Sequence, residues 1–357
     1  MFSKIKELFI HYERYILPVS FLAGFIWDNL TLRRIDLWLE NILFAAHIFI
    51  VLAVILMLNV YEGGRFRRWA LEKYLPLFMQ FSFGALFSGF FVFYSRSGSP
   101  ATSWPFLLFL GLLLIGNEMF RKHYLRLTFQ LNIFFIILFS YAVFLLPVVM
   151  GRMGKIIFLL SGLASMALMG LIIFILFRLS PLQFKKSKQA LFPSIAAIYF
   201  IFNLFYFTNV LPPMPLSLKE IGLYHSAEKS GEQYLLTYEP AQWYPFFSKE
   251  SGVFRRADNA SVYVYSAVFA PTKLHTAILH EWSYYDENKR EWIKTDQILF
   301  PISGGRDGGY RGYSLKQGVM PGKWRVGVIT ERDQLIGRIK FRVIKSDKLP
   351  NLETVVR

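Results

Sequence analysis

The chain contains no cysteine, which excludes disulfide bonds, thiolate metal ligands and cysteine nucleophiles. Histidine is also scarce, with six in 357 residues, so few side chains could serve as a general base or a metal ligand. No Gly-x-Ser-x-Gly nucleophile motif is present, and no repeat of solenoid length is visible. The sequence therefore predicts no catalytic residue, no metal site and no cofactor.

Charge is nearly absent from long stretches of the first 210 residues. A helix needs roughly 20 apolar residues to cross the ~30 Å hydrocarbon layer, because its backbone polar groups must be satisfied internally. This pattern predicts a membrane α-helical bundle of about seven transmembrane helices over residues 1–210. The segments are Ile16–Leu32, Asn41–Tyr61, Tyr74–Ser95, Thr102–Asn117, Leu127–Val149, Ile156–Phe177 and Ala190–Asn209. The first holds Asp28 near its end, and whether it spans fully stays open.

Lysine and arginine are distributed unevenly between the two sides of this bundle. Fourteen lie in segments on the side of the N-terminus and five on the other side. Short loops rich in these residues are retained in the cytoplasm. The N-terminus is therefore predicted to be cytoplasmic, and seven crossings place the C-terminal domain in the periplasm or outside the cell. The net charge of +16 arises mostly from this asymmetry and does not indicate a nucleic-acid partner.

A proline-rich stretch, Leu211–Leu218, cannot continue the last helix, so residues 211–219 are predicted to form an extended linker. After it the hydrophobic period changes to two, which is typical of half-buried strands. Seven strands are expected, near Gln233–Tyr238, Val262–Phe269, Thr276–Tyr285, Trp292–Phe300, Gly309–Leu315, Lys323–Thr330 and Leu335–Ile344. They predict an all-β antiparallel sandwich over residues 220–357, with a core around Trp282, Trp292 and Trp324.

Four short motifs follow one another in this domain: His280-Glu-Trp282, Arg311-Gly-Tyr-Ser314, Gly322-Lys-Trp-Arg-Val326, and Gly337 with Phe341-Arg-Val343. Their order and spacing resemble the bacterial family catalogued as domain of unknown function 2914. The resemblance covers roughly the last 90 residues, and the proline exit Pro212–Leu216 resembles that of its membrane-tethered members. It implies a protein of the bacterial cell envelope in the inner (plasma) membrane. It brings no catalytic residue, because none is established for that family.

The strand pattern places Lys323, Arg325, Arg338, Lys340 and Arg342 on one face of the last hairpin. Like charges on neighbouring strands repel one another unless an anionic group meets them. An acidic envelope glycan, a phospholipid headgroup or an acidic partner protein would each serve. The simpler interpretation is a solvated face that acidic neighbours such as Asp296 neutralise. Arg311 and His280 are further ligand-binding candidates, although His280 is also explained as a hydrogen-bonded strand residue beside Trp282.

Ionisable residues inside a membrane are costly, which makes Asp28 and His47 candidates for function. Both are expected in the outer half of the bilayer, where they could form a polar pocket for a lipid headgroup or a proton. A structural hydrogen bond and an interfacial carboxylate form the simpler alternative.

These patterns favour a non-catalytic membrane protein that presents a β-sandwich outside the cytoplasm to bind an envelope component or a partner protein. The alternative is an enzyme or carrier that acts on a lipid-linked substrate at the outer leaflet, with Asp28, His47 and either His280 or Arg311 converging. A transporter is the third hypothesis. The partner that the sequence predicts in every case is the lipid bilayer.

Overall fold

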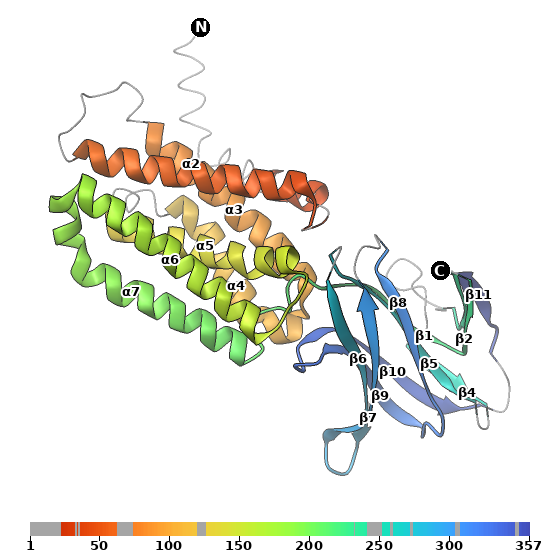
Figure 1. Ribbon diagram of the computed structural model, residues 1–357. Coiled ribbons are helices and arrows are strands. Elements are labelled where there is room, and N and C mark those ends of the chain that lie inside the picture. Colours follow the sequence, from red (N-terminus) through yellow and green to blue (C-terminus); the bar gives the residue numbers. More distant parts are fainter. Residues whose placement is uncertain are drawn as a thin grey trace, which may run out of the picture. The chain divides into compact units, whose positions relative to one another are not determined.

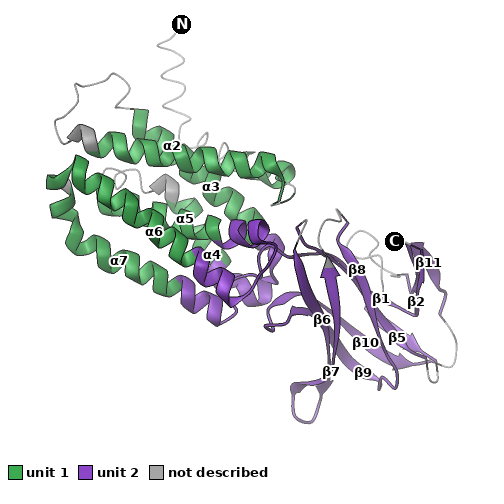
Figure 2. Ribbon diagram, viewed as in Figure 1, with its two compact units in different colours: residues 1–94, 107–142, 162–201 green, residues 95–106, 143–161, 202–357 purple. Residues whose placement is uncertain are grey.

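The computed structural model describes residues 23–32, 34, 36–62, 74–119, 126–231, 233–240, 252–257, 260–271, 274–303, 308–346 and 350–357. The chain divides into two compact units (Figure 2). The first contains residues 1–94, 107–142 and 162–201, and the second contains residues 95–106, 143–161 and 202–357. Each unit is described by itself below.

The N-terminal half is helical (Figure 1). Its helices are α2 (Trp38–Glu62), α3 (Leu75–Ser97), α4 (Pro100–Met119), α5 (Leu127–Met150), α6 (Lys155–Leu179) and α7 (Pro181–Phe207), and residues 23–31 form a helical stretch before them. Within the described residues, five helices are long and apolar enough to cross a membrane, and the apolar part of α4 is shorter. The predicted helical membrane bundle is confirmed, while residues 16–22 of its first segment lie outside the described residues.

Helix α5 is the most enclosed of the five spans, with 67% of its apolar window buried. Amide side chains link it to a neighbour, because Asn59 of α2 donates to Gln130 Oε1 at 2.8 Å. Ser194 of α7 donates to Asn132 Oδ1 at the same distance. Such hydrogen bonds join helices within lipid, where hydrophobic burial gives little preference for helix contact over lipid contact. Close approach of α6 and α7 depends on Gly162, where a Cβ would lie 2.9 Å from the Tyr199 side chain.

The C-terminal half consists of strands, here called the β domain (residues 217–357). The strands are β1 (Ser217–Tyr224), β2 (Ser226–Ser230), β3 (Gln233–Tyr238), β4 (Val253–Arg256), β5 (Val262–Phe269), β6 (His275–Asp286), β7 (Glu291–Ser303), β8 (Tyr310–Lys316), β9 (Gly322–Thr330), β10 (Leu335–Lys345) and β11 (Glu353–Val356). They form a three-stranded sheet β1-β5-β8, a five-stranded sheet β4-β10-β9-β6-β7 and a three-stranded sheet β11-β3-β2.

All seven predicted strands are present, and every pairing among them is antiparallel, so the β fold class is confirmed. Four strands were not predicted. β2, β4 and β11 have only five, four and four residues, which is too short for an alternating pattern to be recognised. β1 follows the prolines directly, and its first three residues, 217–219, had been expected to belong to the linker. β4 also departs from the antiparallel pattern, because it pairs with β10 in parallel.

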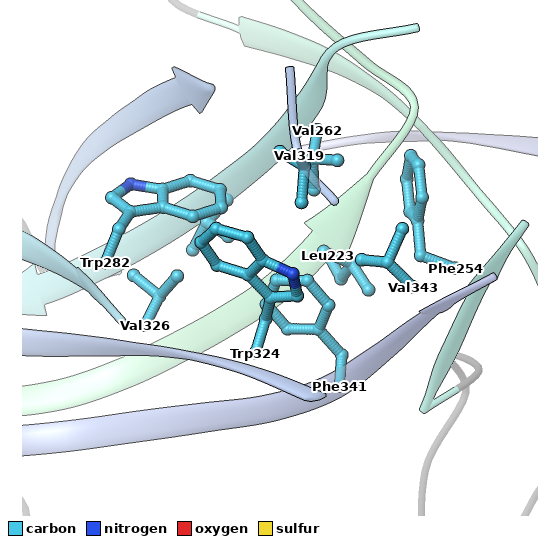
Figure 3. Packing of buried hydrophobic residues seen from close by; sticks show 10 residues of the cluster. Leu223, Phe254, Val262, Trp282, Val319, Trp324, Val326, Phe341 and Val343 are labelled. Carbon is cyan, nitrogen blue, oxygen red and sulfur yellow. The ribbon is translucent and has the colours of Figure 1, made fainter. Parts of the chain in front are cut away.

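The main core lies between the five-stranded sheet and the sheet β1-β5-β8 (Figure 3). Its large side chains include Trp282, Trp324 and Phe341, and the facing sheet contributes Leu223 of β1 and Val262 of β5. Trp282 is completely buried, and its ring meets that of Phe341 edge to face at 6.3 Å. Trp324 donates its Nε1–H to the carbonyl of Met320 at 2.8 Å, so its polar atom is satisfied within the fold.

The assignment of Trp292 to the core was wrong. The pairing of β6 with β7 shifts between Trp282 and Ser283, which leaves Thr295 of β7 as an extra residue. One extra residue moves the side chains before it to the other face of the strand. Trp292 therefore shares the outer face with Tyr285, its register partner, instead of the inner face with Phe300.

Segments from the helical half belong to the same compact unit as the β domain. The amide of Ser99, between α3 and α4, donates to the carbonyl of Leu335 at 3.3 Å, and Met153, between α5 and α6, packs against a core cluster of the domain. After α7, Asn209 donates to the carbonyl of Arg332 at 3.0 Å. The guanidinium of Arg332 lies 4.0 Å from the ring centroid of Tyr206. The turn between β9 and β10 is thus held against the ends of membrane helices.

We expect Trp324→Ala to lower the free energy of unfolding of the full chain by ~3–5 kcal/mol, because it removes a buried indole from the core. Trp292→Ala is the matched control, and the part-exposed position of Trp292 predicts a clearly smaller loss. Thermal or denaturant unfolding in detergent measures both. Equal losses would contradict the placement of the two tryptophans.

Candidate functional site

The candidate site is the outer surface of β9 and β10. Lys323, Arg325, Arg338, Lys340 and Arg342 form this surface and are called the basic face. In the antiparallel register, Lys340 lies opposite Arg325 and Arg342 lies opposite Lys323. The residues between them, such as Trp324 and Phe341, point into the core. Burial of the apolar alternate residues therefore forces five cations onto the other side of the hairpin.

The electrostatics of Arg325 reflect this crowding. Partial burial lowers the pKa of Arg325, the nearby charge of Arg338 lowers it further, and Glu281 of β6 raises it. A guanidinium stays charged in proteins despite such shifts. The basic face therefore carries mutual repulsion that an added anion would relieve.

Aromatic rings adjoin the basic face on its β6–β7 side. The Arg325 guanidinium lies 4.6 Å from the ring centroid of Trp292, and the Lys323 ammonium lies 5.1 Å from that of Tyr285. The two rings are themselves 5.3 Å apart. Cations over aromatic faces gain about 0.5–1 kcal/mol at exposed sites, so these contacts orient the two β9 side chains. Sequence reasoning missed this pair because it had assigned Trp292 to the core.

Acidic residues neutralise only part of this surface. Glu287 pairs with Lys323 at 2.9 Å, and Glu281 pairs with Lys294 at 2.5 Å. Asp296, expected as a neutralising neighbour, instead pairs with Lys316 of β8. Among the described residues, no carboxylate forms an ion pair with the three β10 cations, Arg338, Lys340 and Arg342.

His280 lies inside the domain, completely buried. Its Nε2 is 2.7 Å from Ser266 Oγ, its Nδ1 is 2.8 Å from Ser314 Oγ, and Ser314 also accepts the Nε1–H of Trp282 at 3.0 Å. Burial lowers the pKa of His280 to about 3, so the imidazole is neutral at ordinary pH. An enclosed, neutral ring cannot meet a ligand that arrives from solvent, and we leave His280 out of the proposed binding surface.

Arg311 lies on β8, in a different sheet from the basic face. It acts electrostatically on Tyr265, whose pKa is raised to about 12, chiefly by burial, while the positive charge of Arg311 opposes the rise. The carbonyl of Arg311 accepts the hydroxyl of Tyr234 at 3.3 Å. The structure therefore places Arg311 beside a tyrosine cluster, and it is not part of the basic face.

Asp28 and His47 both lie in the first unit. Ser88 donates to Asp28 Oδ2 at 2.5 Å, and His47 Nδ1 lies 3.2 Å from Ser82 Oγ. Both side chains are therefore held by serines of α3. No group of three or more acidic or histidine side chains suited to a metal occurs in the part of the chain that the structure describes.

One small cavity opens in the second unit, lined by Pro147, Ile157, Tyr206, Met214 and Gln334 among others. Its free volume of about 20 Å³ has room for roughly one water molecule. Such a cavity is too small for a lipid-linked substrate.

Comparison with known proteins supports the resemblance seen in the sequence. Residues 275–343 match a family described as a protein of unknown function, DUF2914, and this stretch includes His280 and the whole basic face. The comparison with curated proteins gave no match. Among solved structures, the Pseudomonas fluorescens alkylpurine DNA glycosylase AlkC bound to DNA containing an abasic site analog aligns over 84% of this chain and 96% of its own. Its identity is 8% and the TM-score is 0.20, a value too low to indicate a common fold.

We expect acid to destabilise the β domain through His280. Its pKa is about 3 in the folded chain and near 6.5 when unfolded, so between these values the unfolded chain binds the proton and the folded chain does not. The associated stability is fully present above pH 6.5 and is lost as the pH falls toward 3, at up to about 1.4 kcal/mol per pH unit.

Unfolding measured from pH 7 to pH 4 should therefore show a flatter dependence for His280→Gln than for the natural chain. The exposed histidine of β6, His275, provides the matched control, and the dependence should be flatter in His280→Gln than in His275→Gln. An unchanged slope in His280→Gln would contradict the burial of a neutral imidazole.

Proposed function

We propose that this multi-pass membrane protein uses the basic face of its β domain to bind an anionic component of the cell envelope, without catalysis. The observation that carries the proposal is the row formed by Arg338, Lys340 and Arg342, which no described carboxylate neutralises. Alternate residues of one strand are ~6.5–7 Å apart, so the row presents positive charge at regular intervals. A polymer with repeated anionic groups, such as an acidic glycan, suits this spacing better than a single anion.

The surroundings of the row support an extended ligand. Trp292 and Tyr285 flank the basic face and offer apolar ring edges next to the cations. Arg325 and Lys323 are oriented by these rings, which reduces the conformational entropy that binding would otherwise cost. Arginine, with three of the five positions, can also bind carboxylate or phosphate through two parallel hydrogen bonds.

We also propose that the β domain lies outside the cytoplasm of a bacterium, attached to its inner membrane. The domain contacts Ser99 and Met153, which belong to connections between α3 and α4 and between α5 and α6. Those connections lie on the side of the predicted bundle that has five lysines and arginines. The side of the N-terminus has fourteen. The positive-inside rule therefore favours an external β domain, which is where envelope glycans would be reached.

An enzyme or carrier acting on a lipid-linked substrate is favoured less. That hypothesis needs His280 or Arg311 to converge with the intramembrane pair on one site. His280 is enclosed in the core and Arg311 is placed beside Tyr265 on another sheet, so neither supports such a site. The residues that could act in the membrane, Asp28 and His47, are considered separately below.

Reversing two charges tests the binding proposal. We expect the double variant Arg338→Glu and Arg342→Glu to bind peptidoglycan fragments or phosphatidylglycerol vesicles roughly tenfold more weakly, since each exposed ion pair contributes up to about 1 kcal/mol. Lys229→Glu with Lys289→Glu changes the net charge equally at exposed positions outside the basic face and should have little effect. Added salt should weaken the natural interaction, because exposed charges are screened over ~10 Å at 0.1 M. Equal losses in the two double variants would rule out a specific surface.

The orientation is tested by fusing reporters to the chain. A reporter that is active only outside the cytoplasm should be active after Arg357 and inactive in the 178–188 segment. The reverse result would place the β domain in the cytoplasm and remove envelope glycans from the possible ligands.

A further inference from the structure

Two ionisable side chains in the first unit are held by the same helix. Ser88 of α3 hydrogen-bonds the Asp28 carboxylate at 2.5 Å, and Ser82 of α3 contacts the His47 imidazole at 3.2 Å. Asp28 comes from the helical stretch of residues 23–31 and His47 from α2, so three helices contribute to one cluster. The two contacts place a carboxyl and an imidazole along one helix, at serines six residues apart. An electrostatic interaction between Asp28 and His47 agrees with this arrangement.

The depth of the two residues follows from helix geometry. Asp28 precedes the end of its helical stretch by three residues, or ~4.5 Å, and His47 follows the start of α2 by nine, or ~14 Å. The two serines are six residues apart on α3, which is ~9 Å along the axis and equals the difference between those depths. Measured from these two helix ends, the carboxyl therefore lies closer to the end of its helix than the imidazole does, by ~9 Å.

Net charge decides what such a pair can bind. A carboxylate beside a neutral imidazole leaves a charge of −1 in a medium of low dielectric constant, which is costly. One added proton makes the pair neutral, whether it resides on the carboxyl or on the imidazole. A metal cation is a poorer match, because the described cluster lacks the third acidic or histidine ligand that would complete a site.

We propose that Asp28 and His47 form a proton-binding site in the membrane part of the protein, loaded from the helix end beside Asp28. A proton from water adds either to Asp28 Oδ1, the oxygen that Ser88 does not bond, or to His47 Nε2, because Nδ1 faces Ser82. The same proton leaves to water by the reverse step. This site is independent of the basic face, and either one can exist without the other.

Other titratable groups on these three helices are few. The stretch of residues 23–31 has only Asp28. Besides His47, the described side chains of α2 include Glu40, which is buried, and α3 contributes Tyr94 and Arg96. Glu40 is the other acidic residue that could interact with His47, because it lies in the first turn of the same helix. The experiment therefore includes it.

The test is an infrared pH titration of the purified full chain in lipid. The carbonyl band of the protonated Asp28 carboxyl is identified by its loss in Asp28→Asn. Removing the partner with His47→Gln should move the midpoint of that band by about one pH unit, because strongly coupled groups titrate as a pair. Glu40→Gln is the matched membrane control, and Asp296→Asn is the control in the β domain. A midpoint that moves with Glu40→Gln and not with His47→Gln would overturn the assignment.

A reciprocal measurement keeps the proposal testable if His47→Gln does not fold. Coupling between two binding sites is equal in both directions, so the titration of His47 in Asp28→Asn must shift by about the same amount. Nitrogen-15 resonances of labelled histidine report that titration, and Asn is close to Asp in shape and can keep the Ser88 hydrogen bond. If neither midpoint responds to the other residue, the two contacts are hydrogen bonds between helices and there is no proton site.

Discussion

The pairing of Trp324 with Phe341 is the contact on which the rest of the β domain depends. These two residues are opposite one another in the β9–β10 register, and both are buried in the core beside Trp282. Because side chains alternate along a strand, their burial determines which residues face outward. A shift of one residue in either strand would bring arginine and lysine into the core. The basic face is therefore a geometric consequence of packing the aromatic side chains, and its position is as well specified as the core.

Periodicity in the sequence correctly predicted the long strands and the faces of their side chains. It could not predict features that depend on an irregularity or on helix packing. The long strands β5, β6, β9 and β10 alternate over enough residues for their faces to be assigned. The extra residue at Thr295 interrupts this regularity in β7, and no local signal in the chain marks it. Trp292 was assigned to the wrong face for that reason, and its contact with Arg325 could not be foreseen. The serine partners of Asp28 and His47 were also beyond prediction, because they depend on how three helices pack.

The residues of the motifs that carry the family resemblance fall into two groups, a buried class and an outward class. His280, Trp282 and Ser314 come from two of the motifs and meet in one buried hydrogen-bonded network between sheets. Gly337 also belongs to this class, because a Cβ there would overlap the side chain of Leu218. Arg325 and Arg342 form the second class, because both point outward. Hydrogen bonding of buried polar groups and close packing explain the buried class. A search for function should therefore concentrate on the outward-pointing arginines.

The two proposed sites differ in the medium that surrounds their charges, and this difference makes them separable. Charges of the basic face are exposed to electrolyte, where ions screen them and repeated weak contacts are needed for useful affinity. Asp28 and His47 lie in a membrane bundle, where dissolved ions do not reach and a single proton changes the energy of the cluster substantially. Salt should therefore act on the first site and leave the second unaffected, whereas gain or loss of a proton should act on the second.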